Sequence, residues 1–167
     1  MTNTKTNIVK NLKEKSILVS RTFNAPVALI WRAYTESELL DQWWGPSPWR
    51  AETKSLDFKV GGSWLYAMVG PQGEKHWAIM EYTAIETLKK IGIIDAFSDE
   101  TGVINNAFPK SVGSFLFTET NDGVLVEFKM NYPTEQDILT LVEMGFEQGI
   151  TIGLDQLETL LDVLKSK

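Results

Sequence analysis

Six short strand-like segments between residues 50 and 132, and the turns that join them, constrain the fold most. The segments are about 50–58, 62–69, 75–87, 89–97, 112–120 and 123–132. Turn sequences separate several of them, namely Val60-Gly61-Gly62, Gly70-Pro71-Gln72-Gly73 and Asn121-Asp122-Gly123. The Asp-Gly pair of the last one is a strong hairpin signal. Because consecutive strands joined this tightly must be antiparallel, the sequence predicts one antiparallel sheet.

Another strand and two short helices precede these segments, and a long helical pattern follows them. The stretch 16–23 is rich in β-branched residues and places Ile17, Val19, Arg21 and Phe23 on one face. Short helical patterns lead to Tyr34 and then to Trp43, and a pattern of about 30 residues runs from Thr134 to Leu164. A helix of that length spans ~45 Å and must lie across the sheet. We predict an α+β fold in which a curved, seven-stranded antiparallel sheet with two short helices grips one long C-terminal helix.

The composition excludes several kinds of site. The 167 residues include no Cys and a single His, which rules out disulfides, a cysteine nucleophile and a cluster of thiolate or histidine metal ligands. The 16 Lys and Arg residues against 22 Asp and Glu residues give a net charge of −6, which argues against a nucleic-acid-binding protein. We expect no metal and no organic cofactor.

The N-terminal sequence and the chain length predict a flexible arm followed by a single domain. Residues 1–14 are polar and aperiodic, and we interpret them as a flexible arm. Residues 15–167 have the length of a single domain, which can bury a full core without metals or disulfides. No apolar run approaches the ~20 residues of a membrane span, and the N-terminus lacks the apolar segment of a secretory signal. We therefore expect a cytoplasmic protein.

The candidates for acid–base chemistry lie on one predicted strand. The motifs GxSxG, HExxH, GxxxxGK[ST] and GxGxxG are all missing. His76 and Tyr82 share a strand face, and if that face lines a cavity they could orient or deprotonate an enolic ligand. Glu81 lies on the opposite face, where desolvation would disfavour its charge unless a cation such as Arg21 pairs with it. For all of these residues a purely structural role is the alternative.

Tryptophan is the most conspicuous residue type. Six occur in the chain, and five of them lie between residues 31 and 64. Tryptophan combines a broad apolar surface with an N–H donor, which suits the mouth of a pocket. Trp43 and Trp44 are neighbours at a predicted helix end and cannot both face the same core. One of them is left for a cavity entrance or a partner surface, whereas core packing accounts equally well for Trp31 and Trp64.

Three glycines form a stripe on the predicted long helix. Gly145, Gly149 and Gly153 stand at positions i, i+4 and i+8. Each costs about 1 kcal/mol relative to Ala in a helix interior, so a compensating interaction is expected. Close approach of the helix to the sheet and space for a ligand are the two alternatives.

Several short motifs occur in an order that matches a known family. They are Arg21-x-Phe23-x-Ala25-Pro26, Trp31-x-Ala33, Leu39-x-x-x-Trp43-Trp44-Gly45-Pro46, Val60-Gly61-Gly62-x-Trp64 and Pro71-x-Gly73. With the order of the predicted elements, they make the chain resemble the Hsp90-ATPase-activator-like (AHSA1-like) family of the START-like, or SRPBCC, superfamily, over about residues 14–164. The resemblance implies a helix-grip fold of the START-like, Bet v 1-like kind with a largely apolar internal cavity. It supplies no catalytic motif.

Three functional hypotheses remain open. The first is binding, without catalysis, of a small hydrophobic or amphipathic molecule between the C-terminal helix and the sheet. The second is a polyketide-cyclase-like or hydrolase-like enzyme that uses the same cavity, and the third is a chaperone-partner or homodimeric module built on Trp43 and Trp44. The ligand-binding candidates are Arg21, Trp43, Trp44, Trp64, Tyr66, His76, Tyr82, Phe115, Phe117, Gly145 and Gly149.

Hsp90 itself is not an expected partner. The eukaryotic co-chaperone that names the family joins such a domain to a separate N-terminal domain that grips the chaperone. In this chain only ~14 residues precede the first predicted strand.

Overall fold

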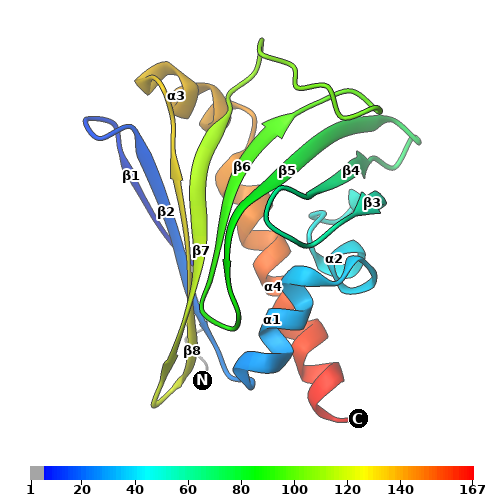
Figure 1. Cartoon of the computed structure of the whole chain (residues 1–167), viewed down its shortest axis with the longest axis vertical. Coiled ribbons are helices and arrows are strands. Elements are labelled where there is room, and N and C mark those ends of the chain that lie inside the picture. Colours follow the sequence, from blue (N-terminus) through cyan, green and yellow to red (C-terminus); the bar gives the residue numbers. More distant parts are fainter. Residues whose placement is uncertain (1–5) are drawn as a thin grey trace.

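A computed structural model describes residues 6–167 and shows one antiparallel sheet curved around a helix (Figure 1). The sheet has eight strands in the order β1-β2-β8-β7-β6-β5-β4-β3, and every neighbouring pair is antiparallel. The predicted α+β, helix-grip arrangement is confirmed, with one strand more than expected. The strands are β1 (Asn7–Asn11), β2 (Ser16–Phe23), β3 (Arg50–Leu56), β4 (Ser63–Val69), β5 (Lys75–Glu86), β6 (Lys90–Phe97), β7 (Ser111–Thr120) and β8 (Gly123–Asn131).

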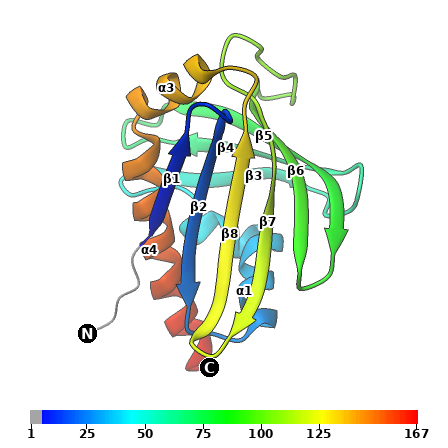
Figure 2. The same cartoon turned by 90° about the vertical axis from the view of Figure 1, so that its left-hand side faces the viewer.

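Four helices complete the fold of residues 6–167. Helices α1 (Val27–Thr35) and α2 (Ser37–Trp43) lie near one end of the sheet, and α3 (Glu135–Glu143) lies near the other (Figure 1). Helix α4 (Phe146–Lys165) runs behind the sheet when the sheet faces the viewer (Figure 2). Within residues 6–167, no helix combines the length and the apolar character that a membrane crossing requires.

The predicted single C-terminal helix is two helices, which corrects the sequence analysis. Thr134 and Asp137 form the expected capping box at the start of α3. The first helix ends near Met144, and Gly145, with φ of 86°, precedes α4. A residue in this left-handed conformation cannot continue a helix, and glycine adopts it without steric strain. Helical periodicity resumes directly after the break, so the apolar pattern alone predicts one continuous helix.

The eighth strand corrects the prediction of a flexible arm. Strand β1 pairs with β2 from Asn7 opposite Ser20 to Asn11 opposite Ser16, and residues 1–5 of the predicted arm lie outside the described residues. Lys10 on this strand places its Nζ 2.6 Å from Oε2 of Glu147 on α4. Most β1 side chains are exposed, so this edge strand is held by backbone pairing and carries little hydrophobic pattern.

The core is solid where α1 and α2 contact α4. The Tyr34 ring makes edge-to-face contacts with the rings of Trp43, Phe115 and Phe117, at centroid separations of 4.9, 5.1 and 5.2 Å. Leu157 of α4 is fully buried in the same cluster. Aromatic contacts of this kind add to the stabilisation from buried area, so this end of the interface is filled by the protein itself.

Candidate functional site

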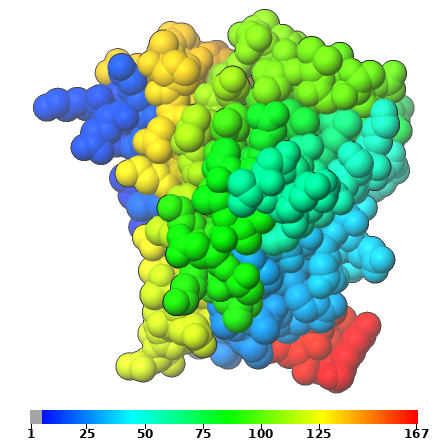
Figure 3. Space-filling model, in the orientation of Figure 1, coloured from blue at the N-terminus to red at the C-terminus, as the bar shows by residue number. Residues whose placement is uncertain are grey.

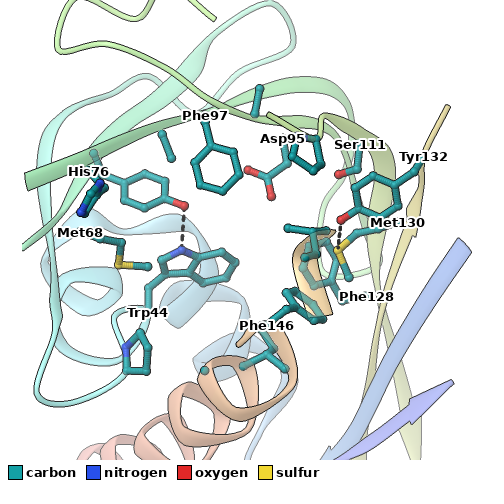
Figure 4. Close-up of a pocket in the computed structure, with 18 residues that line it drawn as sticks. Trp44, Met68, His76, Asp95, Phe97, Ser111, Phe128, Met130, Tyr132 and Phe146 are labelled. Atoms are coloured by element: carbon teal, nitrogen blue, oxygen red, sulfur yellow. Dashed lines mark hydrogen bonds between the residues drawn. The ribbon is translucent and has the colours of Figure 1, made fainter. Parts of the chain in front are cut away.

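A cavity of about 230 Å³ lies at the other end of the interface, between the sheet and the start of α4 (Figure 4). Side chains from β4 to β8 form one wall, and α3, α4 and the segment after α2 close the remainder. The loop between β6 and β7 contributes Pro109. It lies at the top of the face shown in Figure 3. An engineered apolar cavity of ~150 Å³ binds benzene, so this one has room for a single ring with a short substituent.

Strand alternation explains why these side chains meet. Every second residue of a strand points to the same face of the sheet. Tyr66 and Met68 enter the wall from β4, Asp95 and Phe97 from β6, and Phe128 and Met130 from β8.

Six of the 18 residues that line the cavity are Trp, Tyr or Phe. They are Trp44, Tyr66, Phe97, Phe128, Tyr132 and Phe146. Trp44 Nε1 donates a hydrogen bond to Tyr66 Oη at 2.9 Å. The Phe128 ring stacks on Phe115 at 4.2 Å between centroids. The rings of Trp44, Tyr66 and Phe128 are therefore held by contacts with the surrounding protein before any ligand binds.

Asp95 is the one acidic residue that the described part of the chain, residues 6–167, contributes to the wall of this cavity. It lies opposite Ser111 on the neighbouring strand, and Figure 4 shows its carboxyl group pointing into the cavity. Burial raises the pKa of Asp95 to about 7, although a hydrogen bond from the Ala96 backbone N–H acts in the opposite direction. Among residues 6–167, no Lys or Arg lines the cavity to offset this effect. Asp95 can therefore be neutral or ionised near pH 7.

Hydroxyl groups line the cavity together with Asp95. Burial raises the pKa of Tyr66, and the charge of Asp95 raises it further. The same two causes, in the same order, raise the pKa of Tyr132, whereas a hydrogen bond with Ser111 lowers it. Both phenols are therefore protonated at neutral pH. They and Ser111 offer hydrogen-bond donors and acceptors in an otherwise apolar enclosure.

The structure does not bring the three acid–base candidates together. His76 lines the cavity but is exposed, with its ring 5.5 Å from that of Trp49. Tyr82 shares the face of His76, as predicted, but six residues along a strand correspond to ~20 Å. Tyr82 packs edge to face on Phe58 at 4.9 Å, outside the cavity lining. Glu81 lies on the opposite face of β5.

Arg21 points inward as predicted, but its partners differ from the expected Glu81. Its Nη1 lies 2.6 Å from Oδ1 of Asp155, and its Nη2 contacts Glu158, both on α4. The guanidinium lines a separate void of about 10 Å³, the size of a single water site at most. Arg21 therefore ties α4 to the sheet and lies away from the cavity.

Four of the eleven ligand-binding candidates line the cavity, namely Trp44, Tyr66, His76 and Gly149. Trp43 is only 1% exposed and donates a hydrogen bond to the Ala33 carbonyl at 2.9 Å. Trp43 and Trp44 therefore do not form the surface that the interaction-module hypothesis requires. The candidates outside the cavity lining are Arg21, Trp43, Trp64, Tyr82, Phe115, Phe117 and Gly145.

The three glycines of the stripe have three different surroundings. Gly145 occupies the left-handed break before α4. Gly149 lines the cavity, and a Cβ added there would lie 3.6 Å from Pro46 Cγ. Gly153 allows close packing, because an added Cβ would lie 3.4 Å from the Trp43 carbonyl oxygen. Gly149 borders an open space, as one alternative predicts, whereas Gly153 lies close to the C-terminal end of α2 and not to the sheet, so the predicted close approach to the sheet is not found at these glycines.

Sequence reasoning missed Asp95, although a signal was present. On the predicted strand 89–97, Asp95 alternates with Ile91 and Ile93 and precedes Phe97 on the same face. A single carboxylate on an otherwise apolar strand face is unusual, because buried charges are normally paired. The lining residues Phe128, Met130 and Tyr132 were also missed, since their pattern does not differ from that of an ordinary core strand.

Comparisons with known proteins place the chain in a family. The family model described as "Activator of Hsp90 ATPase homolog 1-like protein" matches residues 24–162. Protein Ms6760 from Mycobacterium smegmatis is 29% identical, with a TM-score of 0.86 over 94% of this chain and 96% of that one. A protein from Staphylococcus epidermidis is 30% identical, with a TM-score of 0.81 over 93% of each chain. No curated protein matches the sequence. The chain belongs to the AHSA1-like family and has its helix-grip fold.

Proposed function

We propose that this protein binds a small, largely apolar molecule with one polar group in the cavity between α4 and the sheet. The observation that carries the proposal is a preformed hollow of about 230 Å³ whose walls are mainly aromatic and aliphatic and include the carboxyl group of the half-buried Asp95. Small-molecule sites typically combine apolar walls with a few convergent polar groups. The fixed rings of Trp44 and Phe128 support the proposal, because a rigid site loses little conformational freedom when a ligand binds.

Binding can be tested with ethylbenzene and methionine methyl NMR. The chain has five methionines; Met68 and Met130 line the cavity, whereas Met144 is exposed on the surface. We expect saturable shifts of the Met68 and Met130 methyl signals and little change at Met144. Native mass spectrometry of protein purified without denaturation would show whether a small molecule copurifies.

Two substitutions at Gly149 form a matched pair for this test. Gly149→Leu would extend a side chain from α4 toward the cavity, so ethylbenzene affinity should fall at least tenfold. Gly149→Ala adds one methyl group at ordinary contact distance from Pro46, so ethylbenzene should still bind. Unsaturable shifts in the unmodified protein, or unchanged affinity in Gly149→Leu, would contradict the proposal.

A further inference from the structure

We infer that the ligand of this cavity carries a protonated amine, held by the Asp95 carboxylate and by the faces of the surrounding aromatic rings. This inference rests on the proposed ligand-binding function and adds the chemical class of the ligand.

The charges around the cavity favour a cation over an anion. Among residues 6–167, Asp95 and His76 are the lining residues whose side chains can carry charge near neutral pH, and His76 is exposed. The lining residues contributed by α3 and α4 are uncharged. A ligand carboxylate or phosphate inside the cavity would meet Asp95 without any Lys or Arg to pair with it. Like charges in a desolvated site repel strongly, so an anionic ligand is disfavoured.

The half-buried Asp95 contrasts with Arg21, the one charged side chain that is fully buried among residues 6–167. The Arg21 side chain is 2% exposed and contacts the carboxylates of Asp155 and Glu158. Asp95 has no ion-pair partner among residues 6–167. A buried carboxylate is stabilised by a cation. No side chain of residues 6–167 brings a cation to Asp95, so a bound ligand could supply it.

The rest of the wall suits an ammonium group attached to an apolar body. Aromatic faces attract cations, most strongly when water is excluded, and Trp44, Phe97 and Phe128 all line the cavity. An ammonium group has up to three N–H donors. The carboxylate of Asp95 and the hydroxyl oxygens of Ser111 and Tyr132 are acceptors for them on the same wall, as Figure 4 shows.

Amine binding should be linked to the protonation of Asp95. Burial raises its pKa to about 7, and a bound cation would lower it again. Below pH 7 an amine must therefore displace a proton, so its affinity should rise by up to about tenfold per pH unit toward pH 7 and then level off. Tyr66 and Tyr132 stay protonated across this range. The charge of Asp137 also raises the pKa of Tyr132, but it is the smallest of the causes that act on that pKa.

Four probes of similar shape test the inference at pH 8. They are 2-phenylethylamine, 2-phenylethanol, 3-phenylpropionate and ethylbenzene, each titrated against the Met68 and Met130 methyl signals. We expect the amine to bind roughly ten- to a hundredfold more tightly than the alcohol, as for a charged hydrogen bond, and the carboxylate to bind most weakly. Tighter binding of the alcohol or the carboxylate would overturn the inference.

Variants assign the effect to Asp95. Asp95→Asn should reduce the ratio of amine to alcohol affinity toward one and remove the rise of amine affinity between pH 5.5 and 7. Glu81→Gln makes the same change of charge on the outer face of β5 and should leave the ratio as it is. The methyl spectrum without a probe shows whether each variant folds. The inference would be contradicted if the amine affinity of His76→Gln no longer changed with pH while that of Asp95→Asn still did.

The probes also separate this inference from the proposed function. If ethylbenzene binds and the amine has no advantage at pH 8, the amine inference fails while the binding function stands. If no probe produces saturable shifts at Met68 or Met130, both fail.

Discussion

The two ends of the contact between α4 and the sheet are built from the same layers but are filled differently. At one end, Tyr34 and Trp43 extend from α1 and α2 into the space between the layers and contact the sheet aromatics or each other. At the other end, the first turns of α4 contribute Phe146 and Ile150 to the cavity wall, and the missing side chain of Gly149 leaves part of the space open. Sheet curvature creates the gap, and the local side chains decide whether it closes.

The charged groups at the two ends also differ in their partners. Arg21, near the packed end, is neutralised by two carboxylates of α4. Asp95, in the hollow end, has apolar neighbours and neutral hydroxyl groups around it. A group whose charge is left without a partner destabilises the fold, and proteins retain such groups mainly at functional sites. The difference therefore supports a binding role for the hollow end.

The largest predicted effect comes from two neighbouring tryptophans. Trp43→Ala should lower the free energy of unfolding by about 3–5 kcal/mol, because it opens a void in the packed end and removes the hydrogen bond to Ala33. Trp44→Ala should cost only about 1–2 kcal/mol, because this half-buried side chain already borders a void. Urea unfolding of both variants measures the difference. Equal losses would mean that the two ends are equally well packed.

The next effect concerns the dependence of stability on pH. The pKa of Asp95 is about 7 in the folded protein against an ordinary value of 3.8. Between these values the folded state holds a proton that the unfolded state has lost, so this group makes stability fall as pH rises from about 4 to 7 and adds no further change above 7.

Asp95→Asn should remove this dependence. At pH 8 the variant should exceed the unmodified protein by about 2–4 kcal/mol, since one unit of pKa difference corresponds to about 1.4 kcal/mol. Near pH 4 the two proteins should be almost equally stable. Urea midpoints at both values of pH test this, and a gain of the same size at pH 4 would show that titration of Asp95 is not its cause.

Most of the fold could be predicted from the sequence, because its signals are local. Strand alternation, the Asn121-Asp122-Gly123 turn and the Thr134–Asp137 capping box all lie within a few residues. The break at Gly145 could not be predicted, because helical spacing continues across it. Strand β1 was missed because an exposed edge strand is specified by backbone pairing with β2.

The site was harder to predict than the fold. Sequence patterns place Arg21 on one face of its strand with apolar residues, but they do not show which residues of distant elements lie opposite. Arg21 meets Asp155 and Glu158, which are 134 and 137 residues away along the chain. Trp43 lies in the core and Trp44 in the cavity wall because of the way α2 ends. If the helix were rotated by one residue, the two side chains would exchange places.

A smaller effect is predicted at the buried ion pair of the packed end. The double substitution Asp155→Asn with Glu158→Gln leaves Arg21 buried and uncompensated, and should cost about 2–3 kcal/mol. The Asp155 side chain is 63% exposed, so the loss should stay below that of a fully buried pair. Arg21→Met replaces the charge by an apolar chain of similar length and should change stability by less than about 1 kcal/mol. If urea unfolding shows a larger loss for Arg21→Met, the ion pair itself stabilises the packed end.

The smallest predicted effect compares two glycines at the start of α4. Gly149→Ala should raise the free energy of unfolding by about 0.5–1 kcal/mol, because Ala favours a helix interior and the added methyl group has room. Gly145→Ala should lower it by about 1 kcal/mol, because φ of 86° is unfavourable for any residue with a Cβ. Thermal unfolding of the two variants should give shifts of opposite sign. A loss of stability in Gly149→Ala would mean that the hollow end has no free space beside α4, and the contrast with the packed end would then disappear.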